Sequence, residues 1–224
     1  MSNYKTVFFI LGVLQIILGL SMIVPIMAQF YYNQVDSGFI GSGLVSIIFG
    51  VLFFLSNLDY EKKLTLPQAF LLTALSWLSI AIFGSLPFVF SDLSLSFTNA
   101  FFESMSGITT TGSTILTNLN ETPKAILLWR AMLQWLGGIG IIVMAITLMP
   151  IMNIGGMQLF VISNTHTPEK ILPKSKEISI RLIAIYSSLT LVCAFFYKIF
   201  GMSFFDSIVH SMTTIATGGF SNYN

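Results

Sequence analysis

The sequence predicts an all-α integral membrane protein, a polytopic helical bundle in which units of span, re-entrant pore loop and span repeat. The first observation behind this prediction is composition: of 224 residues, 54% are hydrophobic and 8% are charged, with a mean hydropathy of +0.85. A water-soluble domain could not expose such a surface. The second observation is a short apolar stretch with a Thr/Gly-rich end that occurs twice. The balance of 10 Lys and Arg against 9 Asp and Glu gives no indication of a nucleic-acid partner.

Five apolar segments have the roughly 20 residues that a spanning helix needs. They cover residues 7–29, 38–57, 70–91, 124–149 and 178–200. The first is longer than the hydrophobic region of a secretory signal and has no convincing small-residue cleavage site, so we expect a retained span.

Two further segments, 96–108 and 203–215, are too short to cross a membrane, since a helix of this length extends only about 20 Å. Each ends in a Thr/Gly/Ser string, TTTGST or ATGGFS, that interrupts a helix and exposes backbone groups. At membrane depth such a backbone is tolerated only where it is buried in protein or lines a water-filled path. We therefore predict two re-entrant pore loops.

The two loops are copies of one pattern. A shift of 107 positions places SFTNAFFESMSGITTTGST (96–114) on SFFDSIVHSMTTIATGGFS (203–221) without a gap. Thr110 then matches Thr217, and Gly112 matches Gly219. Two aligned copies, each after a spanning helix, indicate repeated span–loop–span units.

The chemistry of these loops favours a cation. Glycine lets the chain turn its carbonyl oxygens into a narrow passage, where a ring of carbonyls can replace the hydration shell of potassium. The partly negative C-terminal end of each short helix favours a cation at the same place. A single Thr/Gly string could also serve helix packing, but two aligned copies favour a filter. The loop chemistry thus predicts a cation filter formed by Thr110, Thr111, Gly112, Thr217, Gly218 and Gly219, and no cofactor is expected on this chain.

The basic residues predict the orientation. With the N-terminus in the cytoplasm, seven of the ten basic residues lie at inner loops or helix ends, as the positive-inside rule requires. Both short helices then dip in from the outer side, and the hydrophilic stretch 151–177 becomes a cytoplasmic linker. The inner residues are Lys5, Lys62, Lys63, Lys170, Lys174, Lys176 and Arg181, and the outer ones are Lys124, Arg130 and Lys198.

Charged residues inside the membrane need partners, because an unpaired charge is costly there. Glu103 lies midway along the first short helix, and Arg130 lies about two turns into the following span. We predict that they form a buried structural pair that holds the short helix to its return span. Asp206 and His210 are expected to cap or pack the second short helix. A close helix-packing face is expected from Gly137, Gly138 and Gly140.

The stretches FFESMSGITTTGST, WRAMLQWLGGIGIIVMAITLMP and GGMQLF strongly resemble the TrkH-type potassium uptake proteins of the Trk/Ktr/HKT superfamily. The resemblance covers nearly the whole chain. In that family two leading helices precede four span–loop–span units, whose loops surround one pseudo-fourfold potassium filter. By resemblance, the leading pair is 1–57, the first unit is 70–150, the linker is 151–177 and an incomplete second unit is 178–224.

The resemblance further implies a multi-pass protein of the bacterial inner membrane that takes up potassium by a channel or symport route. Its implied partners are membrane lipid, a homodimer partner and a cytoplasmic nucleotide-binding subunit of the TrkA type. Because the sequence stops just after the second loop, we expect either a fragment of a longer protein or a truncated product that does not conduct alone and acts at most as an assembly module. A secondary transporter with re-entrant hairpins is a further alternative, but its loops should carry convergent charged or hydrogen-bonding side chains, which these loops lack. No enzyme is expected, since no His/Asp/Glu cluster, nucleophile motif or phosphate-cradling loop is found.

Overall fold

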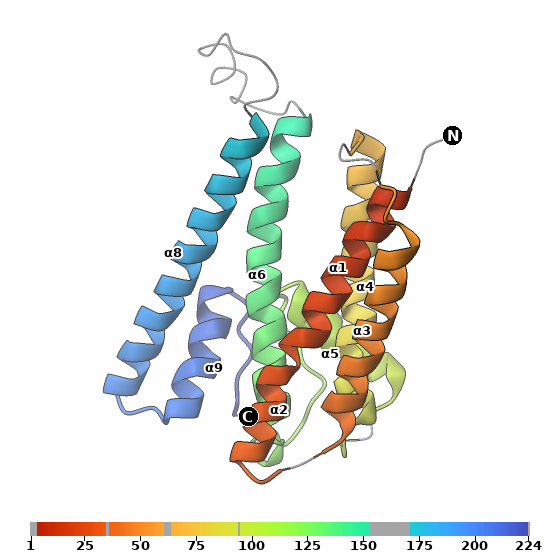
Figure 1. The fold of residues 1–224 in the computed structure, drawn as a ribbon. Coiled ribbons are helices and arrows are strands. Elements are labelled where there is room, and N and C mark those ends of the chain that lie inside the picture. The colour runs from red at the N-terminus through yellow and green to blue at the C-terminus, as the bar shows by residue number, and fades with distance from the viewer. Residues whose placement is uncertain (1–3, 35, 61–63, 94, 153–170, 224) are drawn as a thin grey trace.

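The computed structural model describes residues 4–34, 36–60, 64–93, 95–152 and 171–223, and the regular elements of this described part are all helices, without a strand (Figure 1). Most of the expected linker, residues 153–170, lies outside the described residues. The α-helices are α1 Lys5–Ser21, α2 Ile23–Tyr31, α3 Gly38–Ser56, α4 Leu66–Phe90, α5 Phe97–Ile108, α6 Lys124–Met152, α8 Ile171–Ile199 and α9 Phe204–Ile215, and a short 3-10 helix η1 covers Leu119–Glu121.

Five helical segments are long and apolar enough to cross a membrane, in agreement with the five predicted spans. They are Lys5–Tyr31, Gly38–Ser56, Leu66–Phe90, Lys124–Met144 and Glu177–Ile199. Helix α4 begins four residues earlier than expected, because Thr65 and Gln68 form a capping box in which the Thr65 amide donates to Gln68 Oε1 at 2.8 Å. Helix α8 begins at Ile171, within the stretch 151–177 that is expected to form a linker.

The first span is interrupted at Met22, between α1 and α2. Pro25 has no amide hydrogen and so cannot donate to the carbonyl of Ser21, four residues before it. The break therefore follows from the sequence, although the apolar run itself continues through it.

Helices α1 and α3 form an antiparallel hairpin with a close glycine crossing. A Cβ on Gly12 would lie 2.7 Å from the Gly50 carbonyl oxygen, and a Cβ on Gly19 would lie 2.9 Å from that of Gly43. Only residues without side chains let two backbones approach so closely. The hairpin is joined to α4 by the buried Gln15, whose Nε2 donates to Ser79 Oγ at 2.6 Å.

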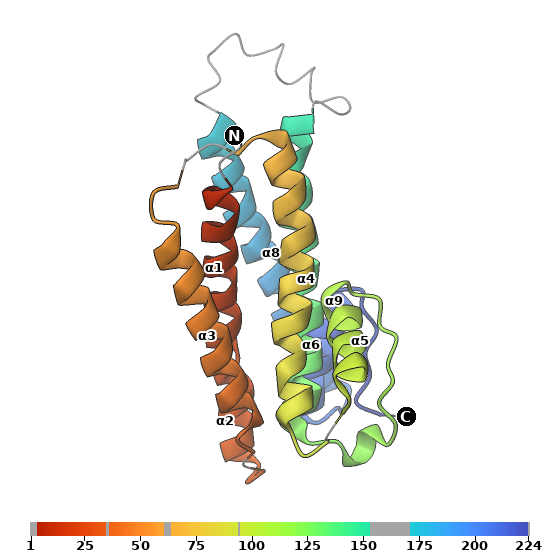
Figure 2. The same cartoon turned by 90° about the vertical axis from the view of Figure 1, so that its right-hand side faces the viewer.

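The short helices α5 and α9 lie in the half of the bundle where α4 ends and α6 begins, away from the start of α1 (Figure 1). The chain rises through α5, turns, and returns to η1 near the end at which α5 began (Figure 2). Each short helix starts at an aligned serine cap: Ser96 Oγ accepts from the Asn99 amide at 3.3 Å, and Ser203 Oγ accepts from the Asp206 amide at 3.1 Å. The bounds of α5 and α9 agree closely with the predicted 96–108 and 203–215.

Helix α6 is the central element and contacts α2, α4, α5, α8 and α9. A Cβ on Gly137 would collide with the Ile108 carbonyl oxygen at the end of α5, and a Cβ on Gly138 would collide with the Tyr186 hydroxyl on α8. These two glycines form the predicted packing face. The third, Gly140, does not belong to the close crossing, since its Cβ would lie 4.0 Å from the nearest atom, on Trp77.

Candidate functional site

The first predicted filter loop begins where α5 ends in a reversing turn. The Thr110 amide donates to the Gly107 carbonyl at 2.9 Å, and the Thr111 amide donates to the Ser106 carbonyl at 3.0 Å. This pair of bonds is the Schellman pattern, which satisfies the last carbonyls of a helix and turns the chain back. The backbone is left-handed at Thr110, with a φ of 56°, and again at Gly112, with a φ of 78°.

The second predicted filter loop has the same geometry after α9. The Thr217 amide donates to the Thr214 carbonyl at 2.9 Å, and the Gly218 amide donates to the Thr213 carbonyl at 2.9 Å. The φ angles are 55° at Thr217 and 77° at Gly219. The sequence repeat is therefore also a repeat of backbone conformation, residue for residue.

A left-handed threonine is unusual, because the branched Cβ crowds the backbone there, and such a residue costs of order 1–3 kcal/mol. Finding it at both Thr110 and Thr217 shows that the two turns are built alike. Strained backbone of this kind is concentrated at functional sites, where the surrounding structure holds it in place.

The two loops touch each other. A Cβ on Gly112 would collide with the Gly218 carbonyl oxygen, so the missing side chain of Gly112 is what admits the second loop. Thr111, Thr217 and Gly219 are exposed, and Gly218 is buried. All six predicted filter residues thus lie in two adjoining loops, three of them with an open face.

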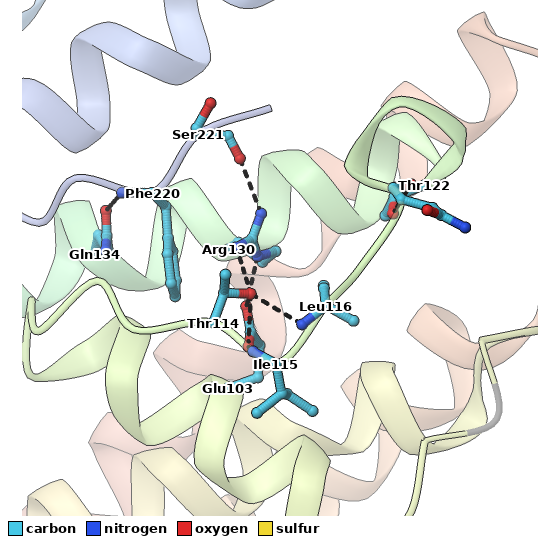
Figure 3. A network of polar contacts seen from close by, with 10 residues as sticks. Glu103, Thr114, Ile115, Leu116, Thr122, Arg130, Gln134, Phe220 and Ser221 are labelled. Atoms are coloured by element: carbon cyan, nitrogen blue, oxygen red, sulfur yellow. Dashed lines mark hydrogen bonds and ion pairs between the residues drawn. The ribbon is translucent and has the colours of Figure 1, made fainter. Parts of the chain in front are cut away.

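The return limb of the first loop is held by an ion pair. Arg130 Nε lies 2.7 Å from Glu103 Oε1, and the side chains are 1% and 0% exposed. Glu103 also accepts hydrogen bonds from Thr114 Oγ1 at 2.9 Å and from the Ile115 amide at 3.0 Å (Figure 3). Because the carboxylate is buried, these donors and the guanidinium together replace the water it has lost.

Arg130 also reaches the second loop, which the sequence reasoning did not anticipate. Its Nη1 donates to the Ser221 carbonyl at 3.1 Å, and its guanidinium carbon lies 4.2 Å from the centre of the Phe220 ring. One turn further along α6, Gln134 Oε1 accepts from the Phe220 amide at 3.2 Å (Figure 3). A signal for Gln134 was present, since it is a polar residue four positions after Arg130 in an apolar span.

The return limb of the second loop is anchored on a different acid. Asp206 accepts from Ser203 Oγ at 2.6 Å, from Asn222 Nδ2 at 2.7 Å and from Tyr223 Oη at 2.7 Å. Burial acts to raise the pKa of Asp206, but the hydrogen bonds from these three residues, together with the charge of Lys124, outweigh it and hold the pKa below its ordinary value. The hydrogen bond that the Tyr223 hydroxyl donates to Asp206 in turn raises the pKa of Tyr223.

The two anchors are not aligned in the repeat. The shift of 107 positions places Glu103 on His210, and places Asn99 on Asp206. The acid of the second copy is therefore one turn nearer the start of its helix, while the His210 ring stacks on Tyr223 with centroids 6.2 Å apart. Asp206 and His210 thus pack the second short helix and its loop. Within the described part of the chain, no group of three His, Cys, Asp or Glu residues could hold a metal ion.

Known proteins are similar to this chain in sequence and in structure. The family described as TrkH, cation transport protein, matches residues 35–224. The potassium uptake protein TrkI of Halomonas elongata is 40% identical over 214 residues, which is 95% of this chain and 44% of that protein. TrkH of Escherichia coli is 38% identical over 226 residues, which is 99% of this chain and 47% of that protein.

A solved structure is also similar. The crystal structure of the potassium transporter TrkH from Vibrio parahaemolyticus has a TM-score of 0.88 and 36% identity, and the match covers 99% of this chain and 45% of that one. The chain thus spans a little under half the length of the relatives it matches. By sequence and by fold, it belongs to the TrkH family of cation transport proteins.

Proposed function

We propose that this chain supplies two of the loops of a potassium filter and so conducts potassium as part of a Trk-type uptake protein in the bacterial inner membrane. The observation that carries the proposal is the pair of touching loops with the same backbone, in which Thr110 and Gly112 repeat the φ angles of Thr217 and Gly219. Rings of equivalent backbone carbonyls are the means by which proteins replace the hydration shell of potassium.

The site works without ionised groups of its own. Glu103 and Arg130 are paired with each other behind the first loop, so no free carboxylate is needed to bind the ion. The C-terminal ends of α5 and α9 place their partial negative charge at the two turns, which favours a cation. We assign ion binding to the backbone of Thr110, Thr111 and Gly112, and of Thr217, Gly218 and Gly219.

The family arrangement has four such loops around one axis, and this chain supplies two of them. We further propose that the N-terminus and the stretch 151–177 face the cytoplasm. The start of α1, the end of α6 and the start of α8 lie at one end of the bundle, opposite the pore loops, which supports a common side (Figure 1). By family likeness, the proposed partners are a TrkA-type nucleotide-binding subunit on that side and a second copy of the protein.

Membrane lipid is the proposed surrounding of the outer helices. Large apolar side chains on α3 and α8 are widely exposed, Leu44 by 56% and Leu191 by 72%. Side chains of this size are not left facing water in such numbers, whereas hydrocarbon accommodates them.

The rival candidate is a secondary transporter that holds an organic substrate at the pore loops. Such a site needs charged or hydrogen-bonding side chains that converge on the substrate. The charged side chains nearest the loops, Glu103, Arg130 and Asp206, are turned to the protein and occupied by other residues. This favours a small cation bound by backbone.

Ion flux tests the proposal. The protein as its gene encodes it would be purified, inserted into liposomes, and given potassium, sodium or an amino acid mixture on the outside. We expect potassium to enter with a clear preference over sodium and no amino acid to enter. Equal flux of both ions would remove the filter assignment, and substrate-driven uptake of an organic solute would favour the rival.

A further inference from the structure

Among the six predicted filter residues, one aligned pair differs: Thr111 of the first loop corresponds to Gly218 of the second. A left-handed backbone does not explain this glycine, because the positive φ angles of the second loop belong to Thr217 and Gly219. Gly218 is buried, whereas Thr111 is exposed. The reason for a glycine at 218 must therefore lie in what packs against it.

What packs against Gly218 is Gln134. A Cβ on Gly218 would collide with the Gln134 carboxamide and lie 2.7 Å from its Nε2. Real Cβ contacts are longer than this, so even alanine would push the amide away. Through its Oε1, the Gln134 carboxamide also accepts a hydrogen bond from the Phe220 backbone amide, at 3.2 Å. Gln134 thus contacts the second loop at Gly218 and at Phe220, the two neighbours of Gly219.

The polar character of Gln134 has a cost. The side chain is fully buried, and within the described residues its Nε2 has no acceptor. An unpaired buried donor is unfavourable, so an apolar residue of the same size would serve packing alone better. What only the amide supplies is an acceptor for the Phe220 amide hydrogen.

We propose that Gln134 is a positioning residue for potassium selectivity, and that Gly218 is glycine in order to admit it against the second filter loop. Gln134 belongs to α6, the return span of the first unit, so the first unit sets the position of the second unit's loop. Arg130, one turn earlier on α6, acts in the same direction through the Ser221 carbonyl. Gln134 does not touch the ion. It acts through the backbone of Phe220 and Gly218, and the inference rests on the proposed function.

A compensation experiment tests the pairing. Gly218→Ala, Gln134→Ala and the double variant would be compared with the wild type by the ratio of potassium to sodium flux in liposomes. We expect each single variant to reduce the ratio by about tenfold, as the loss of one buried contact or hydrogen bond allows. Adding Gly218→Ala to Gln134→Ala should change the ratio by less than about twofold, because the obstructing amide is gone. Equal losses from Gly218→Ala in both backgrounds would overturn the proposal.

Two further variants separate positioning from general damage. Gly112→Ala collides with the Gly218 carbonyl rather than with Gln134, so Gln134→Ala should not rescue it. Gln134→Met keeps the size of the side chain and removes the acceptor, so it should lower the flux ratio at wild-type expression. A wild-type ratio in Gln134→Met would contradict the role of the hydrogen bond.

The failure of the proposed function would look different. If the wild type showed no preference for potassium, the filter assignment would fail at that point. Thermal unfolding of the same four proteins of the compensation set would then decide whether Gln134 and Gly218 are coupled. Additive losses of stability would refute the pairing independently of transport.

Discussion

Thr110 and Thr217 have the same left-handed backbone, with φ of 56° and 55°, although they lie 107 positions apart. Each is the second residue after the end of a short helix, and each is followed two residues later by a left-handed glycine. Glycine would adopt the threonine conformation without strain. Stability alone therefore does not explain why both turns have a threonine at this position.

Replacing these threonines should separate stability from selectivity. We expect Thr217→Gly to raise the free energy of unfolding by up to about 1 kcal/mol, because relief of the left-handed strain exceeds the entropy cost of glycine. The ratio of potassium to sodium flux should fall, because the turn becomes more mobile. Thermal unfolding and liposome flux measure the two effects. Thr117→Gly, at an exposed residue without a positive φ, is the control and should not gain stability. A less stable Thr217→Gly would show that the strain argument is wrong.

The glycines of the proposed filter should differ from one another. Serine at Gly112 meets both a left-handed φ and the Gly218 carbonyl oxygen, whereas serine at Gly219 meets only the φ of 77°, with open space around it. We expect both variants to lose potassium preference, and Gly112→Ser to lose more stability.

The matched control for this pair is Gly201→Ser. Gly201 has a φ of 100° and nothing within 4 Å of its Cβ position, but it lies outside the loops. It should lose stability and retain the flux ratio. Gly50, in a leading helix, is unsuited as a control because its Cβ would lie 2.8 Å from the Gly12 carbonyl oxygen. Unchanged potassium preference in both filter variants at normal expression would refute the filter assignment.

Glu103 and Arg130 should behave as a coupled pair. Glu103→Gln leaves a buried guanidinium without its counter-charge, which should cost about 3–5 kcal/mol of folding free energy. Adding Arg130→Gln should cost much less than the sum of the two single changes, because the uncompensated charge is then removed. Denaturant unfolding in detergent would measure this double-mutant cycle, with the exposed Glu121→Gln as control. Strictly additive losses would reject the pairing.

Acid should weaken the anchor of the second loop. The pKa of Asp206 is lower in the folded protein than its ordinary value of about 3.9, so the hydrogen-bonded carboxylate contributes stability above about pH 4. That contribution is lost as the pH falls through the lowered pKa. Asp206→Asn should therefore be less stable than wild type at pH 7, and the difference should shrink below about pH 4. Thermal unfolding from neutral to acid pH would show it, and a constant difference would contradict the assignment.

Labelling from outside intact cells should give the orientation. In a Cys193→Ala background, we expect Glu121→Cys, beside the pore loops, to react with an impermeant thiol reagent, and Asp59→Cys to react only after the cells are broken open. The positive-inside distribution of Lys and Arg is the reason. The opposite pattern would invert the orientation and, with it, the side from which the loops enter.

Much of this architecture could be predicted because it depends on local composition. Spans follow from apolar length, and the bounds of α5 and α9 follow from serine caps and Thr/Gly ends that lie within a few residues of each helix. The contact of Arg130 with Ser221 could not be predicted, because it joins residues 91 positions apart through a packing that no periodicity encodes. Gly218 is a second example. The sequence predicts it as a filter glycine, but its contact with Gln134 depends on how closely α6 approaches the second loop.

The glycine crossing between α1 and α3 has a bearing on how the protein is made. Every residue of that contact lies before Asn57, so the hairpin needs nothing from the pore loops in order to pack. Both helices can enter the bilayer and join while the ribosome is still translating the segments that follow. The growing chain then adds α4, and its Ser79 meets a Gln15 that the hairpin has already placed. Insertion in this order places α4 on the hairpin before α5, which packs on α4, has been made.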